Sequence, residues 1–168
     1  MAVLPHPEIV LIGAGNVGFH LGKRLAEKGM KPVQVFSRSE ARARSLGETI
    51  KTSFITRLEE INPDAGLYIL AVRDDAIENV AAQLASRVSG NPLVVHTSGA
   101  TPSSSLAGFH PRFGVFYPLQ TFSREREVAF DTIPICIDAA REEDAQTLKR
   151  IGERLSSRVC RIDDGQRA

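Results

Sequence analysis

Short runs of consecutive apolar residues alternate along the chain with longer segments in which apolar positions recur every three or four residues. The runs at 9–12, 67–72 and 93–96 are typical of parallel strands that are covered on both faces. The segments at 17–25 and 145–155 have the periodicity of helices that bury one face. Strands that alternate with helices in this way favour a sheet with helices packed against it.

Shorter patterns complete the alternation. They predict strands at 31–36, 49–54, 113–117, 133–137 and 158–162 and helices at 40–46, 57–61 and 77–88. Asp75 with Glu78 has the spacing of a capping box before the last of these helices, and Thr101 is a favourable N-cap for a short helical turn. We therefore expect one domain over 1–168 with an α/β fold, a doubly wound and mainly parallel sheet with helices on both faces.

A glycine-rich motif follows the first predicted strand directly. Its six residues are Gly13, Ala14, Gly15, Asn16, Val17 and Gly18. Between a strand and a helix, the first glycine allows a sharp turn, the second lets the backbone approach a ligand, and the third lets the helix pack closely. The N–H groups and the macrodipole of the helix attract phosphate oxygens. The motif therefore predicts a Rossmann dinucleotide site in which these six residues hold the pyrophosphate.

The end of the second predicted strand bears on which dinucleotide binds. An NAD site places a carboxylate there, roughly 20 residues beyond the third glycine, where it accepts hydrogen bonds from the ribose. This chain has Ser37 and Arg38 instead, and a hydroxyl with a guanidinium suits a 2′-phosphate. We predict NADP, while Glu40 keeps NAD open as the alternative. Arg42 and Arg44 either add positive potential or form a solvated helix face.

Residues that follow the fourth and fifth predicted strands are further candidates, because ligands of doubly wound sheets bind beyond the carboxyl ends of the strands. Val72, Arg73, Thr97 and Ser98 are predicted to contact the cofactor. For Arg73 two roles stay open, since its guanidinium could reach the pyrophosphate or pair with Asp74.

Candidates for the chemistry itself are weaker. Hydride transfer to a carbonyl or imine needs a proton or hydrogen-bond donor at the developing charge. His96, Ser98 and Tyr117 lie where the fifth and sixth strands end and are the candidates for this role. His96 also fits a structural histidine at a strand end. Because no secure acid or base emerges, a module that senses a dinucleotide without catalysis is the alternative function.

Composition argues against several other classes of function. The formal net charge is +1 and charges of both signs are interspersed, which argues against a nucleic-acid partner. The sequence has no signal-peptide pattern and no apolar run long enough to cross a membrane, so we expect a cytoplasmic protein without membrane contact. The four histidines lack metal-ligand spacing, and no metal is expected. Cys136 and Cys160 lie in apolar runs and are expected to be buried, reduced thiols.

Several motifs together resemble one family. They are the glycine motif, Ala71-Val72-Arg73-Asp74-Asp75, His96-Thr97-Ser98-Gly99-Ala100, Tyr117-Pro118-Leu119-Gln120-Thr121-Phe122 and Ile133-Pro134-Ile135. Over nearly its whole length the chain resembles NADP oxidoreductases that join a Rossmann-like N-terminal domain to a helical C-terminal domain of unknown function. More distantly it resembles pyrroline-5-carboxylate reductases, 3-hydroxyacid dehydrogenases and prephenate dehydrogenases. The resemblance implies hydride transfer between NADP(H) and a small carbonyl, hydroxyl or imine substrate.

The same resemblance implies a second domain. In the related reductases the helical domain dimerises and closes the substrate site over the nicotinamide, so a homodimer is expected when that domain is present. This chain stops at 163–168, about where the helical domain would begin, and relatives often have His-Pro where it has Tyr117-Pro118. We therefore expect it to bind cofactor but to be inactive alone. The helix face with Leu148, Ile151 and Leu155, or the stretch at 117–122, is expected to be the surface that the helical domain covers.

Overall fold

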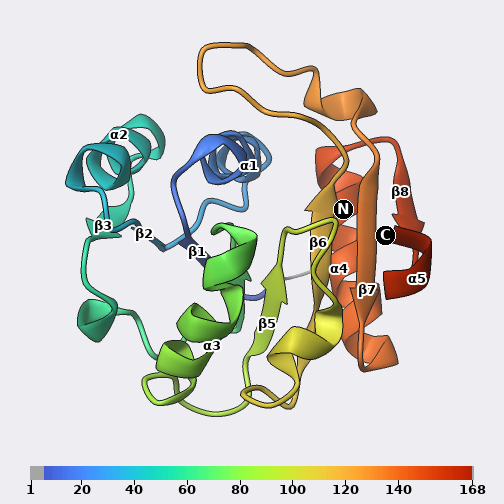
Figure 1. The fold of residues 1–168 in the computed structure, drawn as a ribbon. Coiled ribbons are helices and arrows are strands. Elements are labelled where there is room, and N and C mark those ends of the chain that lie inside the picture. Colours follow the sequence, from blue (N-terminus) through green and yellow to red (C-terminus); the bar gives the residue numbers. More distant parts are fainter. Residues whose placement is uncertain (1–5, 168) are drawn as a thin grey trace.

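The computed structural model describes residues 6–167, so the ends of the predicted domain at 1–5 and 168 lie outside the described residues. The described residues form an eight-stranded sheet (Figure 1). Its strands are β1 Ile9–Ile12, β2 Gln34–Phe36, β3 Ser53–Ile55, β4 Leu67–Leu70, β5 Leu93–His96, β6 Phe113–Pro118, β7 Ile135–Ala139 and β8 Val159–Arg161. In space their order is β3-β2-β1-β4-β5-β6-β7-β8.

The first six strands run parallel, β7 is antiparallel to β6, and β8 is parallel to β7. The order of the first six is that of the Rossmann dinucleotide-binding fold. The predicted fold class, a doubly wound and mainly parallel sheet, is therefore confirmed. Strand order reverses between β1 and β4, and the carboxyl ends of these two strands flank the crevice in which ligands of such sheets bind.

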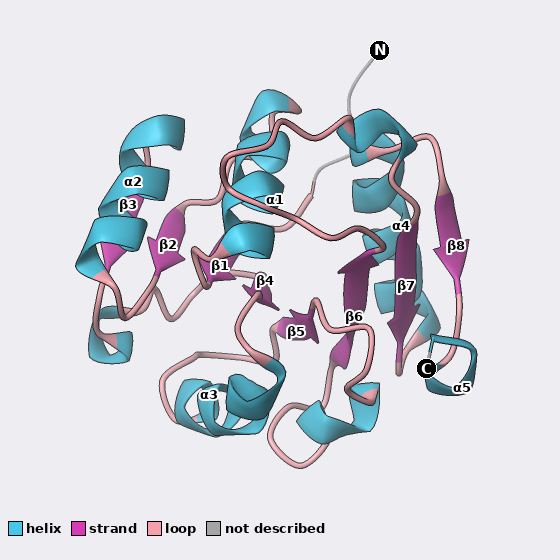
Figure 2. Cartoon of the chain, turned by 45° about the horizontal axis from the view of Figure 1, so that its top comes forward, coloured by secondary structure: helices cyan, strands magenta, loops and turns pink. Residues whose placement is uncertain are grey.

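Helices cover both faces of the sheet (Figure 2). They are α1 Asn16–Glu27, α2 Glu40–Ile50, α3 Ile77–Ala85, α4 Glu142–Leu155 and the short α5 Asp164–Arg167. Helices α1, α2 and α4 pack their apolar residues against one face, and α3 packs against the other. Single 3₁₀ turns occupy Leu58–Glu60, Asp74–Ala76, Ser103–Leu106 and Phe130–Thr132. Within residues 6–167, no helix has both the length and the apolar content that crossing a membrane requires.

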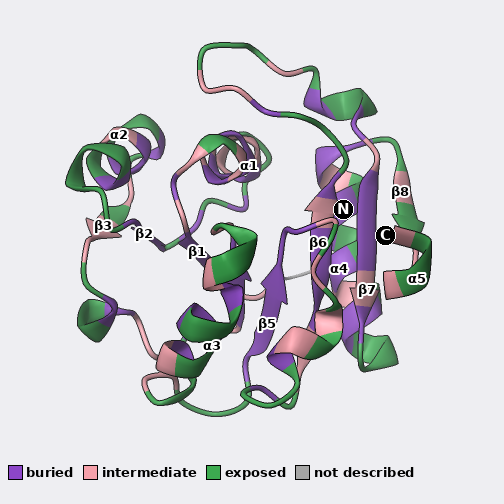
Figure 3. Ribbon diagram, viewed as in Figure 1, coloured by how far each residue is buried: buried purple, intermediate pink, exposed green. Residues whose placement is uncertain are grey.

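The central strands are buried on both faces, which explains their unbroken apolar sequences (Figure 3). Successive side chains of a strand point to opposite faces. In β1, Ile9 and Leu11 therefore join the core beneath α1, whereas Val10 and Ile12 join the core beneath α3. This doubly packed layer fixes the strand ends from which the candidate site is built.

Helix α2 is longer than the sequence indicates. It continues to Ile50 instead of ending near Leu46. Gly47 lies inside the helix, and a Cβ at this position would lie 2.6 Å from the ring of Phe54. The glycine allows α2 to pack closely on β3, and the helix is closed by its C-cap residue Lys51, whose φ of 56° is left-handed.

Both predicted helix caps are wrong. Helix α3 begins without a side-chain cap, and the carboxylate of Asp75 accepts hydrogen bonds from the guanidinium of Arg73. Thr101 does not cap the turn that begins at Ser103, since the backbone N–H of Ser103 donates to Asp164 at 3.0 Å. A competing partner, two residues away in the first case and 61 residues away in the second, replaces the predicted contact.

The apolar face of α4 belongs to the core of the sheet. Leu148, Ile151 and Leu155 are at most 2% exposed and pack with the residues beneath α1. The expectation that this face is left for a further domain is therefore wrong. In the other stretch assigned to that role, Leu119 is 50% exposed whereas Phe122 is buried.

Candidate functional site

The turn between β1 and α1 requires glycine at its first position. Gly13 has a φ of 116°, a conformation that side chains rarely adopt. A Cβ at Gly13 would lie 2.1 Å from the carbonyl oxygen of Ala71, at the end of β4. The N–H of Gly13 donates to the carbonyl of Phe36 in β2 at 2.8 Å. The turn is thus fixed between the two strands that neighbour β1.

The other two glycines of the motif have opposite surroundings. A Cβ at Gly18 would lie 2.0 Å from the carbonyl oxygen of Gly13, so this glycine lets α1 approach the turn closely. A Cβ at Gly15 would meet no described atom within 4 Å. Packing within the protein therefore explains Gly13 and Gly18 but not Gly15. The open space at Gly15 fits a cradle for a ligand that the backbone approaches directly.

The start of α1 suits an anion. Gly15 is the N-cap residue and, having no side chain, makes no capping hydrogen bond. The first intrahelical hydrogen bond runs from the N–H of Phe19 to the carbonyl of Gly15, so the N–H groups of Asn16, Val17 and Gly18 are left for a ligand. The first turn contains no acidic residue. Together with the helix macrodipole, these N–H groups can bind phosphate oxygens.

The loop after β2 presents one unpaired cation. Ser37 is buried, and its hydroxyl accepts the N–H of Ser39 at 3.2 Å. Arg38 is exposed, and within residues 6–167 its side chain makes no hydrogen bond or ion pair. Glu40, the carboxylate that kept NAD open, pairs with Arg44 at 2.7 Å. The guanidinium of Arg38 is therefore available to a ligand, whereas that of Arg44 is engaged on α2.

The strand end on the other side of the crevice contributes Val72 and Arg73. Val72 is half-buried and packs at the edge of the core beneath α3. The Arg73 side chain is exposed and pairs with Asp75 at 3.1 Å, rather than with Asp74. An exposed ion pair of this kind contributes little to stability, so its guanidinium can exchange Asp75 for a phosphate.

The loop after β5 is held by its own polar groups. The hydroxyl of Ser98 accepts the N–H groups of Ala100 and Thr101 and donates to the hydroxyl of Thr101 at 3.0 Å. The N–H of Thr97, which is buried, donates to the carbonyl of Leu70 at the end of β4. These bonds fix Thr97 and Ser98 beside the crevice.

His96 is fully buried, and both of its ring nitrogens face this loop. Nδ1 accepts the N–H of Ser98 at 3.1 Å, so the ring proton resides on Nε2, which faces the carbonyl of Pro102 at 3.3 Å. Burial lowers the pKa of His96, and the neutral form therefore predominates near neutral pH. These contacts give the imidazole a structural role in shaping the loop.

Tyr117 joins the same region from β6. Its ring and hydroxyl pack where a Cβ of Gly99 would be, at 2.6–2.8 Å from that position. Gly99 therefore makes room for a half-buried tyrosine. The structure thus brings together the three catalytic candidates His96, Ser98 and Tyr117 at the carboxyl ends of β5 and β6.

Arg124 is a contact of the glycine-rich turn that the sequence does not indicate. From the loop between β6 and β7, its guanidinium donates to the carbonyl of Ala14 at 2.7 Å and to the hydroxyl of Ser45 in α2 at 3.0 Å. It also lies 4.3 Å from the ring centroid of Phe19. Because Ala14 is 110 residues away, no local pattern could reveal this contact.

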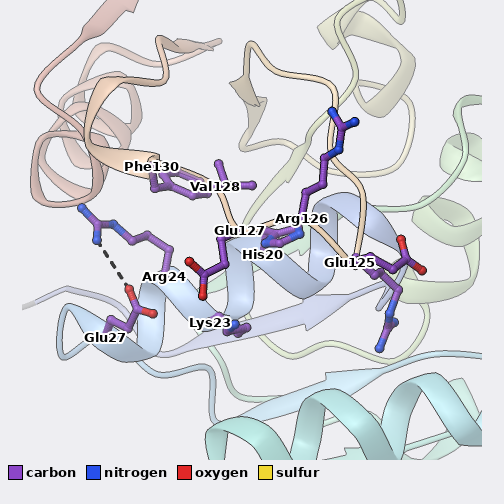
Figure 4. Close-up of a pocket in the computed structure, with 10 residues that line it drawn as sticks. His20, Lys23, Arg24, Glu27, Glu125, Arg126, Glu127, Val128 and Phe130 are labelled. Carbon is purple, nitrogen blue, oxygen red and sulfur yellow. Dashed lines mark hydrogen bonds and ion pairs between the residues drawn. The ribbon is translucent and has the colours of Figure 1, made fainter.

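A polar cavity of about 320 Å³ lies between α1 and the same loop (Figure 4). Most of the side chains that line it are charged, and both signs are present. The lining residues are His20, Lys23, Arg24, Glu27, Arg124, Glu125, Arg126, Glu127, Val128 and Phe130. Its α1 residues come from the second turn onward, beyond the N–H groups of Asn16, Val17 and Gly18. Arg124 connects the cavity to the glycine-rich turn, because its guanidinium also donates to the carbonyl of Ala14.

Comparison with known proteins bears on the family of the chain. The model of the family described as NADP oxidoreductase, coenzyme F420-dependent, matches residues 8–99, which is more than half of the chain. A provisionally assigned NADP oxidoreductase from Bacteroides fragilis is 44% identical and superimposes with a TM-score of 0.92 over 96% of this chain. No curated protein sequence matches the chain.

More distant solved structures share the fold. A prephenate dehydrogenase from A. aeolicus has a TM-score of 0.85 at 13% identity over 99% of this chain. A pyrroline-5-carboxylate reductase from Coxiella burnetii has a TM-score of 0.78 at 16% identity over 95%. The chain spans 62% of the Bacteroides protein, 63% of the dehydrogenase and 60% of the reductase. By the family match, this chain belongs to the NADP oxidoreductase, coenzyme F420-dependent, family.

Proposed function

We propose that the chain is the NADP(H)-binding domain of an oxidoreductase that transfers a hydride between the cofactor and a small carbonyl, hydroxyl or imine substrate. The observation that carries the proposal is the contrast among the three glycines: two are required by contacts within the protein, and Gly15 faces open space. That open position lies at the N-terminus of α1, where phosphate oxygens are favoured. The family match supports a nicotinamide- or flavin-type dinucleotide.

Each part of the crevice holds a different part of the cofactor in this proposal. The backbone from Gly13 to Gly18 binds the pyrophosphate, and Ser37 with Arg38 binds the 2′-phosphate. The unpaired guanidinium of Arg38 supports NADP over NAD, because charge-assisted bonds to a phosphate are strong. Val72 and Arg73 after β4, with Thr97 and Ser98 after the neighbouring strand β5, line the path of the nicotinamide half. The bound nicotinamide supplies or accepts the hydride.

Tyr117 is the residue that we propose as proton donor. His96 and Ser98 use their polar side-chain atoms within the loop after β5. Within residues 6–167 the hydroxyl of Tyr117 makes no hydrogen bond, so it is free to donate to a developing oxyanion or amine. In a version extended through the family's helical domain, Tyr117→Phe should lower kcat by roughly 10²–10⁴-fold and leave the Kd of NADPH unchanged.

A dinucleotide sensor without catalysis is the second candidate, favoured by the engagement of His96 and Ser98 in structural contacts. Turnover distinguishes the two functions. The extended version, for which we propose a homodimer, is assayed for NADPH oxidation with a panel of small carbonyl and imine compounds. Oxidation with any of them supports the oxidoreductase. Tight NADPH binding with no turnover across the panel would instead support the sensor.

A further inference from the structure

The two cysteines of the chain lie opposite each other on neighbouring strands. Cys136 in β7 and Cys160 in β8 are directly paired in the parallel register, and their sulfur atoms are 3.6 Å apart. Cys136 is buried, as expected from the sequence, but Cys160 is exposed, which corrects the expectation of two buried thiols. The sequence does not indicate that the two cysteines are neighbours, because 24 residues separate them and they do not form a C-x-x-C motif.

The surroundings allow the two sulfur atoms to approach further. A disulfide needs an S–S distance of about 2.05 Å, so each thiol has to turn toward the other. Strand β8 has three residues and lies at the edge of the sheet, where, among residues 6–167, β7 is the one strand that pairs with it. A short edge strand can shift slightly at low cost, since it lacks a second neighbour.

We propose that Cys136 and Cys160 are a redox modification site, a thiol pair that a low-molecular-weight disulfide of the glutathione type converts reversibly into an intramolecular disulfide. The thiolate of Cys160 attacks one sulfur of the small disulfide, whose S–S bond breaks, and the released thiolate takes up a proton. Cys136 then loses its proton to solvent, and its sulfur attacks the sulfur of Cys160 and expels the second small thiol. In total, two protein thiols lose two electrons and two protons, and one small disulfide becomes two thiols.

The order of attack follows from the positions of the two thiols. Only Cys160 is accessible to a molecule in solution. Burial raises the pKa of the Cys136 thiol to about 11, so this sulfur is a poor nucleophile toward outside reagents. The sulfur of Cys136 nevertheless reacts with the mixed disulfide on Cys160, because that disulfide forms beside it.

Intact-mass measurement of the chain in glutathione buffers tests the proposal. The reduced chain is incubated with oxidised glutathione, free thiols are blocked, and the mass is recorded before and after reduction. The chain should lose two hydrogen atoms, carry no glutathione, and recover its original mass on reduction. Peptide mapping should find Cys136 linked to Cys160. Since the chain has no other cysteine, the result has a single interpretation.

Two single variants and a denatured control make the outcome decisive. Cys136→Ser should retain one glutathione on Cys160, and Cys160→Ser should remain unmodified over the same period. In urea, where the register is lost, the unsubstituted chain should mainly retain glutathione adducts. Folding of each variant is checked by circular dichroism, with Cys136→Ala as a second substitution of the buried thiol. A native chain that keeps the adduct, stays fully reduced or links to a second chain would overturn the proposal.

Discussion

The glycines of the turn after β1 differ in what their missing side chains allow. At Gly13 and Gly18 the space of the missing side chain is filled by a backbone carbonyl oxygen of the protein. At Gly15 that space is open and can be filled by a ligand. Sequence spacing predicts all three roles, because the spacing of a strand–turn–helix unit is local. The sequence could not predict that the Arg38 side chain is unpaired, because this depends on the ion pair that Glu40 forms with Arg44.

Gly15→Val should abolish dinucleotide binding while the chain stays folded. Gly15 has a φ of −77°, which valine adopts without strain, and a Cβ there meets nothing within 4 Å. The branched side chain would occupy the space of the pyrophosphate. Calorimetry should detect no NADPH binding, and the thermal unfolding midpoint should change by only a few degrees.

Gly18→Val is the matched control at the third glycine. Its Cβ would lie 2.0 Å from a backbone oxygen, so this variant should be strongly destabilised or fail to fold. If Gly15→Val folds and binds NADPH with unchanged affinity, the assignment of this turn as the pyrophosphate site is wrong.

At the scale of elements, the sequence predicts strands and helices well where the pattern is local. The buried strands β1, β4 and β5 appear as predicted, because burial on both faces leaves an unbroken apolar run. The length of α2 could not be predicted, since Gly47 serves a contact with Phe54 that only the folded chain creates. Arg124 and the register of Cys136 with Cys160 likewise depend on distant segments.

Buried histidines join neighbouring elements and make the fold sensitive to acid. Nε2 of His110, after the third 3₁₀ turn, contacts the carbonyl of Ala81 in α3 at 2.9 Å, and His96 shapes the loop after β5. Burial lowers the pKa of both side chains below the ordinary 6.5. Below pH 6.5 these histidines are protonated in the unfolded chain but remain neutral in the folded chain. The free energy of unfolding therefore falls as the pH falls.

We expect the free energy of unfolding to fall between about pH 7.5 and about pH 5.5, by at most about 1.4 kcal/mol per pH unit for each histidine. Urea unfolding at several pH values measures this slope. His110→Gln keeps an N–H donor for the Ala81 carbonyl and removes the titration, so the slope should become shallower. An identical slope in this variant would contradict the role of His110.

At the scale of the whole molecule, alternating strands and helices predict the parallel half of the sheet but not its far edge. Strand β7 runs antiparallel to β6, and the segment between them, 119–134, contains a single 3₁₀ turn and no crossover helix, which agrees with that direction. The candidate site lies entirely on the parallel part, at the ends of β1, β2, β4, β5 and β6. The direction of β7 and β8 therefore does not affect the prediction of the site.

The 168-residue chain should bind NADPH but catalyse no hydride transfer. It spans 62% of the Bacteroides relative, in which a further segment is available to enclose a substrate, whereas the three catalytic candidates of this chain lie at the carboxyl ends of β5 and β6. Holding a substrate at the nicotinamide in a site without water is worth about 7–11 kcal/mol of barrier. NADPH absorbance with the same substrates should show turnover only in the version extended through the helical domain. Equal rates for both would show that these residues complete the site alone.

Calorimetric titration of the chain with NADPH and with NADH tests the central claim most directly. NADPH should bind more tightly, and Arg38→Ala should reduce this preference by about 1–3 kcal/mol, the range for a charge-assisted contact. Arg150→Ala, which removes an exposed arginine on α4, should leave the preference unchanged. Equal affinities for the two cofactors in the unsubstituted chain, or no binding of either, would contradict the account.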